Sequence, residues 1–149
     1  MDWKIPNHMF PLEEMVSDMY IHSEGAGEIE RGSQTAYWNR GNSLAGYDIY
    51  RYPTIKRARM EYERRLGQLV DDETNRPWVQ SKEFTFSSAT ADEMFMACGD
   101  WLGRRCGFLA RYQEYVIFFD AVMDEEMTYD DFKKIVLYLD EQISSRLYP

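Results

Sequence analysis

The stretch that decides the fold is EMFMACGDWLGRRCGFLARYQEYVIFFDAVM, residues 93–123. It contains three short apolar runs, Met94–Cys98, Gly107–Tyr112 and Tyr115–Met123. A polar segment separates the first two runs, and only Gln113-Glu114 separates the last two. Short apolar runs joined by short polar turns are typical of antiparallel strands, so we predict a three-stranded meander with a two-residue turn at Gln113-Glu114.

Two further features of this stretch bear on its structure. Val116–Phe119 is apolar at every position, which predicts a strand that is buried on both faces. Thr90 and Glu93 have the spacing of a helix capping box, so a helix over Ala91–Leu102 is the alternative for the first run.

Two amphipathic helices are predicted outside the meander. The first spans Ile55–Val70, where apolar residues recur every three or four positions and Thr54 is the expected N-cap. The second begins after Thr128, and Asp131 follows at capping-box spacing. Its apolar stripe consists of Phe132, Ile135, Val136, Leu139, Ile143 and Leu147.

Three more strands are predicted from alternating and aromatic-rich segments, at Ala36–Arg40, Ala45–Tyr52 and Glu83–Ser87. The expected order is therefore β-β-α-β-β-β-β-α. This order predicts an α+β fold, in which an antiparallel sheet of about five to six strands packs against helices.

The first 35 residues are the least regular part of the chain. Prolines interrupt them at Pro6 and Pro11, so we predict an extended N-terminal arm over residues 1–35 and a single α+β domain over residues 36–149. Within the arm, Leu12–Met19 is expected to form a short helix and Ser23–Gly32 a loop. The arm either lies over the domain or binds a partner with its exposed aromatic residues.

Composition excludes several classes of protein. The 149 residues suffice for one domain, and the net charge of −9 disfavours binding to nucleic acid or to anionic lipid. No apolar run approaches the roughly 18 residues of a membrane-spanning helix, and no charged-then-apolar leader begins the sequence.

The two cysteines, Cys98 and Cys106, are eight positions apart. On neighbouring strands, their Cβ atoms could approach to the roughly 3.5–4.5 Å that a disulfide requires. We predict this disulfide, which implies an oxidising compartment, with two buried free thiols as the alternative. The two histidines, His8 and His22, complete no zinc-ligand spacing with these cysteines.

Charge is distributed unevenly along the chain. The segment Glu114–Glu141 has nine carboxylates and two lysines, a net charge of −7. Its carboxylates at Asp124–Asp131 could hold Ca²⁺, but they lack an Asp-x-Asp-x-Asp-Gly pattern, so a solvated acidic loop before a helix is favoured. Six basic residues lie within fifteen positions around the first helix: Arg51, Lys56, Arg57, Arg59, Arg64 and Arg65. This group predicts a salt-bridged surface, with an acidic partner or head-to-tail self-association as the alternative.

The catalytic motifs that we considered are missing. The sequence has no Gly-x-Ser-x-Gly elbow, no Gly-x-Gly-x-x-Gly and no phosphate-binding Gly-Lys-Ser/Thr run, and neither histidine is close in sequence to a plausible Ser or Cys partner. We therefore expect a non-enzymatic protein with no metal and no cofactor.

Aromatic residues provide the remaining functional signal. The chain has four Trp, eleven Tyr and eight Phe, and Tyr and Trp are enriched at interfaces. The candidate contact residues for a protein partner or small ligand are Tyr37, Trp38, Tyr47, Tyr50 and Tyr52.

Several short motifs also carry a resemblance. They are Tyr50-Arg51-Tyr52, Ala58, Trp78, Ala91-Asp92-Glu93, Arg105-Cys106-Gly107 and Arg111-Tyr112 before Val116–Phe119. In this order the motifs resemble small exported domains of bacterial lipoproteins without assigned activity, broadly PsbP-like. The resemblance implies an antiparallel sheet with helices packed on it and no catalytic residues. The sequence departs from such proteins because it has no signal peptide and no lipobox cysteine.

The sequence thus predicts a non-enzymatic extracytoplasmic domain for binding or surface assembly, whose ligand is a protein or a small molecule. The alternative is a small acidic inhibitor in the cytoplasm, in which the carboxylates of Glu114–Glu141 mimic the phosphates of nucleic acid.

Overall fold

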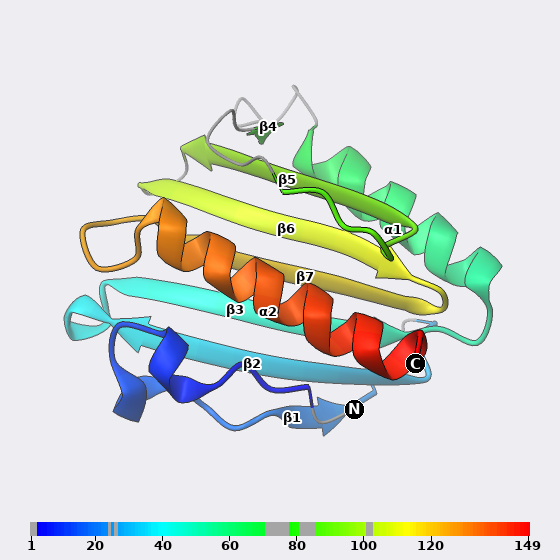
Figure 1. Ribbon diagram of the computed structural model, residues 1–149, viewed down its shortest axis with the longest axis horizontal. Coiled ribbons are helices and arrows are strands. Elements are labelled where there is room, and N and C mark those ends of the chain that lie inside the picture. Colours follow the sequence, from blue (N-terminus) through cyan, green and yellow to red (C-terminus); the bar gives the residue numbers. More distant parts are fainter. Residues whose placement is uncertain (1–2, 24, 26, 71–77, 81–85, 101–102) are drawn as a thin grey trace.

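The computed structural model describes residues 3–23, 25, 27–70, 78–80, 86–100 and 103–149. In this part of the chain, seven strands form one antiparallel sheet in the order β1-β2-β3-β7-β6-β5-β4 (Figure 1). The strands are β1 Tyr20–His22, β2 Glu30–Trp38, β3 Ser43–Arg51, β4 Val79–Gln80, β5 Glu93–Asp100, β6 Arg104–Tyr112 and β7 Tyr115–Val122. The α-helices are α1 Ile55–Leu69 and α2 Tyr129–Leu147, and short 3-10 helices span Asn7–Met9, Glu13–Met15 and Asn39–Gly41.

The two α-helices lie on opposite faces of the sheet (Figure 1). We call these the α1 face and the α2 face. On the α2 face, Phe132 of α2 stacks on Phe119 of β7 in the larger of two hydrophobic clusters. On the α1 face, Ala58 and Tyr62 pack with Leu109 in the smaller cluster. The predicted α+β class is therefore confirmed.

The predicted meander is confirmed as β5, β6 and β7. Tyr112 pairs with Tyr115 across the two-residue turn, where Gln113 has the left-handed φ of 54° that such a tight turn requires. The alternative helix over Ala91–Leu102 is wrong, because Glu93–Asp100 forms a strand that pairs along its whole length with β6.

Both predicted helices are confirmed, together with their caps. The Thr54 hydroxyl accepts a hydrogen bond from the backbone N–H of Arg57 at 3.1 Å, and α1 ends one residue earlier than expected. Thr128 and Asp131 form the predicted capping box of α2. The apolar stripe of α2 is buried from Phe132 to Ile143.

The N-terminal third differs from the sequence-based expectation. The loop predicted over Ser23–Gly32 gives way to β2 from Glu30 onward, and β1 is a strand that the sequence pattern does not predict. The helix predicted over Leu12–Met19 is only a 3-10 turn at Glu13–Met15. The beginning of β2 is polar, so no apolar alternation marks it, and its pairing with β3 holds it in the sheet.

The first residues lie over the α2 face and join its core. Trp3, Ile5 and Phe10 are buried, and the Gln34 side chain hydrogen bonds to both the N–H and the carbonyl oxygen of Ile5. This pair of hydrogen bonds, from the middle of β2, fastens the arm to the sheet.

Two other expectations concern the middle of the chain. Most of the strand predicted at Glu83–Ser87 lies outside the described residues, and Phe86 and Ser87 are not in a strand. Cys98 and Cys106 face each other on β5 and β6, and the structure joins them in a disulfide, as predicted.

Candidate functional site

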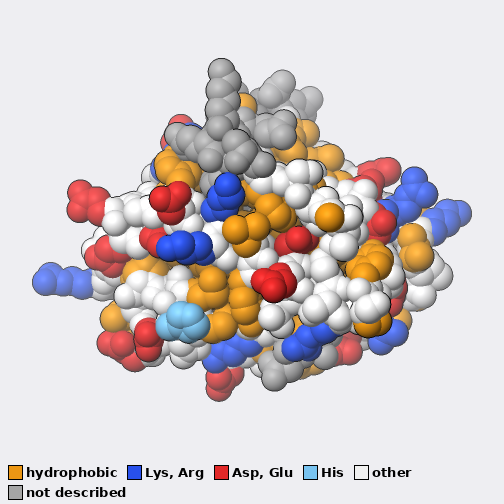
Figure 2. All heavy atoms as spheres, viewed as in Figure 1, with side chains coloured by type: hydrophobic (Ala, Val, Ile, Leu, Met, Phe, Trp, Pro, Cys, Tyr) orange, Lys and Arg blue, Asp and Glu red, His pale blue; other side chains and the backbone are white. Residues whose placement is uncertain are grey.

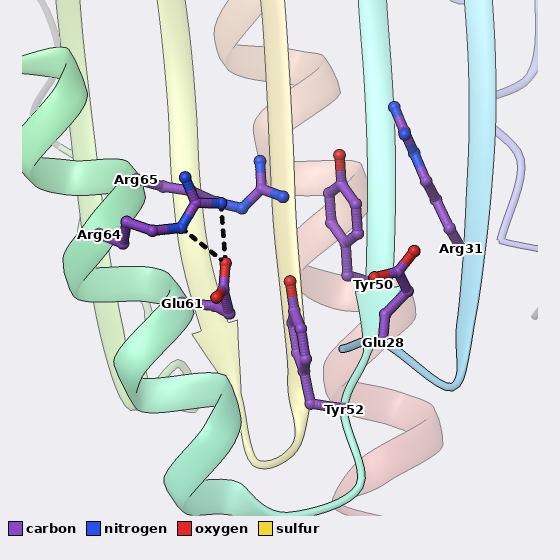
Figure 3. A pocket seen from close by; sticks show the side chains of 7 residues that line it. All are labelled: Glu28, Arg31, Tyr50, Tyr52, Glu61, Arg64 and Arg65. Carbon is purple, nitrogen blue, oxygen red and sulfur yellow. Dashed lines mark hydrogen bonds and ion pairs between the residues drawn. The ribbon is translucent and has the colours of Figure 1, made fainter. Parts of the chain in front are cut away.

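A cleft lies on the α1 face, where α1 meets the end of β3 (Figure 3). Helix α1 packs on β6 and β7, and within the described residues no helix lies over β1 and β2 on this face (Figure 1). The cleft has a volume of about 100 Å³. We call it the α1 cleft, and its lining residues are Glu28, Arg31, Tyr50, Tyr52, Glu61, Arg64 and Arg65.

Tyr50 lies at the centre of the α1 cleft, between two guanidinium groups (Figure 3). The guanidinium carbon of Arg65 is 4.1 Å from the centroid of the Tyr50 ring, and that of Arg31 is 5.0 Å away. Tyr52 stacks beside Tyr50 with their ring centroids 6.3 Å apart. The Tyr50 ring attracts both guanidinium groups by cation–π interaction, and the two rings together form an apolar floor.

Burial raises the pKa of both tyrosine hydroxyls. The carboxylate of Asp48 raises the pKa of Tyr50 further, whereas the guanidinium of Arg65 lowers the pKa of both Tyr50 and Tyr52 without reversing the shift. Both hydroxyls are therefore protonated at neutral pH and are available as hydrogen-bond donors.

The three arginines of the α1 cleft differ in their partners. Arg64 donates two hydrogen bonds to Glu61, at 3.0 and 2.8 Å, and Arg31 donates two to Asp48, at 3.0 and 2.9 Å. Within the described residues, Arg65 forms no ion pair, and its buried Nε has no hydrogen-bond partner. Arg65 is thus the one arginine of the α1 cleft without an ion-pair partner among the described residues.

A polar network continues from the α1 cleft onto the uncovered strands. The Ser33 hydroxyl donates a hydrogen bond to Asp48 at 2.6 Å, and His22 Nε2 lies 3.3 Å from the Ser33 oxygen. The strand pairing of β1, β2 and β3 thus brings a histidine, a serine and an aspartate together, although they are well separated in sequence.

This network does not have the arrangement of a nucleophilic triad. In such a triad the carboxylate orients the histidine, and the histidine accepts the serine proton. Here Asp48 accepts a hydrogen bond from the Ser33 hydroxyl directly and also forms an ion pair with Arg31. The contacts are those of a structural ion-pair network, so they provide no activated nucleophile.

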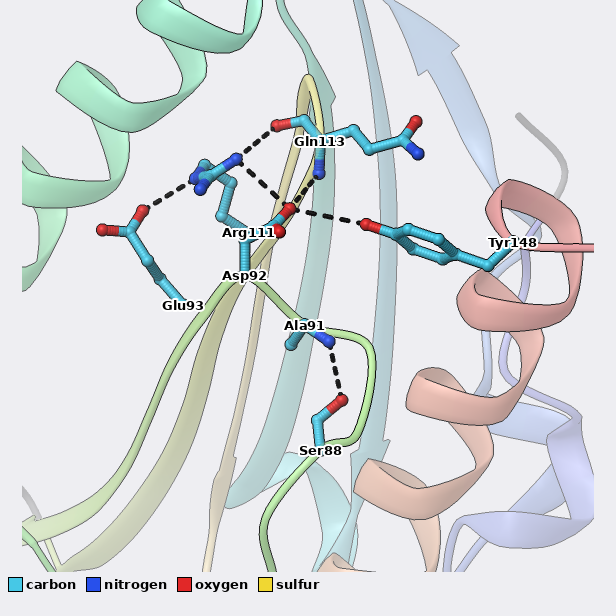
Figure 4. Close-up of polar contacts among 7 residues, drawn as sticks. All are labelled: Ser88, Ala91, Asp92, Glu93, Arg111, Gln113 and Tyr148. Carbon is cyan, nitrogen blue, oxygen red and sulfur yellow. Dashed lines mark hydrogen bonds and ion pairs between the residues drawn. The ribbon is translucent and has the colours of Figure 1, made fainter.

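A second polar cluster surrounds Arg111, whose side chain is buried beside the β6–β7 turn (Figure 4). Arg111 donates to Glu93 at 2.7 Å and to the carbonyl oxygen of Gln113 at 2.9 Å, and it lies 3.4 Å from Asp92. Asp92 also accepts from the Gln113 N–H at 2.8 Å and from the Tyr148 hydroxyl at 3.4 Å. Because carboxylates surround Arg111, this cluster connects β5, the turn and the end of α2 rather than offering a charge to a ligand.

The five candidate contact residues are divided among three places. Tyr50 and Tyr52 line the α1 cleft. Trp38 and Tyr47 lie in the core of the α2 face, 0% and 1% exposed, so they are not part of this site. Tyr37 is 39% exposed and lies near the other end of β2, opposite Leu44.

The acidic and basic residues that face these tyrosines are not evident from sequence patterns. Glu28 and Arg31 fall in the region predicted to be a loop, so no pattern connects them with Tyr50. Arg64 and Arg65 stand out in the sequence only as part of a basic helix surface. The periodicity of the helix places Arg65 nearer the sheet than Arg64. This is the one sequence signal that could indicate which of the two arginines faces the tyrosines.

The carboxylates of the acidic segment are mostly engaged inside the fold. Five of the nine have partners: Glu114 with Arg51, Asp120 with Arg105, Asp124 with Trp38, Asp131 with Thr128 and Asp140 with Tyr112. Figure 2 shows acidic and basic side chains interspersed over the α2 face. Across the described ranges, no group of three or more His, Cys, Asp or Glu residues is arranged to hold a metal ion.

Comparison with known proteins assigns the chain to no family. No family model and no curated protein matches the sequence. Neither α1 nor α2, the two long helices of the described residues, is apolar enough to cross a membrane. The function is therefore argued from the geometry of the α1 cleft.

Proposed function

We propose that this protein is a non-enzymatic binding domain that works outside the cytoplasm and holds an anionic group of a small ligand or protein partner in the α1 cleft. The observation that carries the proposal is the guanidinium of Arg65, which forms no ion pair with the described residues and lies beside Tyr50 and Tyr52. A half-buried guanidinium without a carboxylate gains considerably from an anion, because charge-assisted hydrogen bonds are the strong ones.

The size of the α1 cleft limits what can enter it. A volume of about 100 Å³ holds roughly three water molecules at about 30 Å³ each, whereas pockets for whole ligands measure about 300–1,000 Å³. The α1 cleft therefore suits one oxyanionic group. The rest of the ligand or partner would lie over the uncovered part of the α1 face, along Arg31, Ser33 and His22.

The disulfide supports a location outside the cytoplasm, since cytosolic thiols are kept reduced. We expect protein purified from its native host without reductant, then denatured and alkylated, to resist labelling at Cys98 and Cys106 until it is reduced. Intact mass before and after reduction measures this directly. Two labelled thiols before reduction would contradict the extracytoplasmic location and would favour the cytoplasmic alternative.

That alternative, an acidic inhibitor that mimics nucleic acid, has weaker support. A phosphate mimic needs carboxylates that are exposed and regularly spaced. Here five of the nine carboxylates in Glu114–Glu141 have partners within the fold, and the remaining ones are Glu125, Glu126, Asp130 and Glu141.

The substitution Arg65→Gln tests the anion-binding role. We expect acetate, glycinate or phosphate, added at constant ionic strength, to raise the unfolding temperature of the wild type, because a ligand that binds only the folded state stabilises it. Arg65→Gln should abolish this response, since the guanidinium that would contact the anion is lost. Differential scanning calorimetry or fluorimetry measures the shift.

The matched control is Arg59→Gln, which removes the same charge from an exposed position of the same helix. Its response to the anions should equal that of the wild type. An identical response of the wild type and Arg65→Gln to every anion would refute the proposed function, since any general salt effect acts on both proteins alike.

A further inference from the structure

The residues of the α1 cleft also restrict the chemistry of the anion. We infer that the bound group is a carboxylate with a hydrogen-bond donor on a neighbouring atom, as in a free α-amino acid or the C-terminal residue of a peptide. This inference rests on the proposed function, because it assigns the ligand of the same site.

The charge of the lining residues favours a ligand with no more than a single negative charge. Three arginines and two glutamates line the α1 cleft, and Asp48 is bound to Arg31 at its edge, so the positive and negative charges are equal in number. The pairs Arg64–Glu61 and Arg31–Asp48 leave Arg65 as the one lining cation to which the described residues offer no carboxylate partner. A phosphate dianion would bring a second negative charge close to these carboxylates, and like charges at such distances repel.

The shape of the guanidinium group also suits a carboxylate. Its planar donors match the two oxygens of a carboxylate in a bidentate arrangement. The floor of the α1 cleft is formed by the rings of Tyr50 and Tyr52, which stack nearly parallel, 20° apart. A flat group that lies along these rings remains within reach of Arg65, whose guanidinium already lies over Tyr50.

The carboxylate of Glu61 in the lining favours a ligand that has a hydrogen-bond donor. Both hydrogen bonds from Arg64 go to one oxygen of Glu61, Oε2, and the Glu61 side chain is only 19% exposed, so water solvates it incompletely. An ionised carboxylate only accepts hydrogen bonds. Figure 3 shows Glu61 beside Tyr52 and close to Arg65, so a ligand whose carboxylate contacts Arg65 would have its adjacent atoms near Glu61. An ammonium or amide N–H next to the carboxylate would supply the required donor.

Isothermal titration calorimetry with small probes at neutral pH and constant ionic strength tests the inference. The probes are glycine, N-acetylglycine, acetate, glycinamide and inorganic phosphate. Glycine, N-acetylglycine or both should bind about tenfold or more tightly than acetate and phosphate, because only they combine the carboxylate with a donor. Glycinamide, which lacks the carboxylate, should not bind.

A comparison of glycine with N-acetylglycine distinguishes a free amino acid from the C-terminus of a peptide as the ligand. Tighter binding of glycine indicates a free amino acid, because its ammonium is then required. Tighter binding of N-acetylglycine indicates the C-terminus of a peptide, in which the nitrogen is an amide. Either result supports the inference.

Variants test this inference independently of the proposed function. Glu61→Gln should reduce glycine binding about tenfold while acetate binding persists, and the exposed Glu63→Gln on the same helix should bind like the wild type. Circular dichroism checks that each variant is folded. If phosphate or acetate binds as tightly as glycine and N-acetylglycine, and Arg65→Gln abolishes that binding, the inference is wrong but the proposed function stands. If no probe binds in a way that depends on Arg65, both are wrong.

Discussion

Replacing Asp124 with alanine is expected to lower the free energy of unfolding by about 3 kcal/mol, because it leaves several donors without an acceptor. One carboxylate oxygen of Asp124 accepts from the indole N–H of Trp38 at 2.9 Å and from the Ser43 hydroxyl at 2.8 Å. The other accepts from the backbone N–H groups of Glu126 and Met127. Trp38 is 0% exposed and Ser43 is 3% exposed, so these two donors have the carboxylate rather than bulk water as their acceptor.

Urea unfolding monitored by circular dichroism measures this loss, and the unfolding temperature should fall by roughly 6–12 °C for a domain of this size. Glu125→Ala is the matched control, because it removes a neighbouring carboxylate that is exposed and accepts no such hydrogen bonds. Its effect should stay within about 0.5 kcal/mol. A loss at Asp124 no larger than that of the control would show that the loop is held by other contacts.

The contribution of Asp124 should also depend on pH. Burial by itself would raise the pKa of this carboxyl, but hydrogen bonds from Met127, Ser43, Trp38 and Glu126 outweigh it and hold the pKa below its usual range. A carboxyl whose pKa is lower in the folded state stabilises the protein above its unfolded pKa of about 3.9. This contribution is lost as the pH falls through the lower, folded pKa. The difference between wild type and Asp124→Ala should therefore be constant near neutrality and shrink below about pH 4.

The parts of the fold that the sequence predicted well are those with local signals. Thr54 and Thr128 begin their helices with hydrogen bonds to residues three positions away, so a short window of sequence contains the complete signal. The turn at Gln113-Glu114 is equally local. By contrast, β1 is only three residues long and the first half of β2 is polar. The place of β1 in the sheet depends on its pairing with β2, and that of β2 on its pairing with β3.

The candidate site was harder to predict, because three separate segments form it. Glu28 and Arg31 come from the start of β2 and the segment that leads into it, Tyr50 and Tyr52 from the end of β3 and the residue after it, and Arg65 from α1. Sequence alternation indicates that Tyr50 and Tyr52 share one face of the strand, but it does not reveal which helix covers that face. Trp38 and Tyr47 are equally aromatic, yet they lie in the core of the opposite face. Alternation places Tyr47 on the face opposite to Tyr50, but only the packing of α1 shows which of the two faces carries the cleft.

Replacing Arg111 with methionine is the second substitution with a large expected effect, a loss of about 2–3 kcal/mol in the free energy of unfolding. The Arg111 side chain is 8% exposed and contacts Glu93 at 2.7 Å and Asp92 at 3.4 Å. Without it, two carboxylates remain beside each other and the carbonyl oxygen of Gln113 loses its donor. The loss stays below that of a fully buried ion pair, because Asp92 and Glu93 are 41% and 29% exposed and water screens them.

Two measurements separate this effect from a simple loss of packing. Urea unfolding of Arg111→Met, with the exposed Arg59→Met as its control, gives the energy. Hydrogen exchange at the Gln113 amide, which donates to Asp92 at 2.8 Å, reports on the cluster itself, because Asp92 loses the cation that positions it. Faster exchange there, together with the lower stability, is the expected result. Unchanged exchange at Gln113 would mean that Asp92 holds the turn without Arg111, and the role of this cluster as the connection between β5, the turn and the end of α2 would then rest on Asp92 alone.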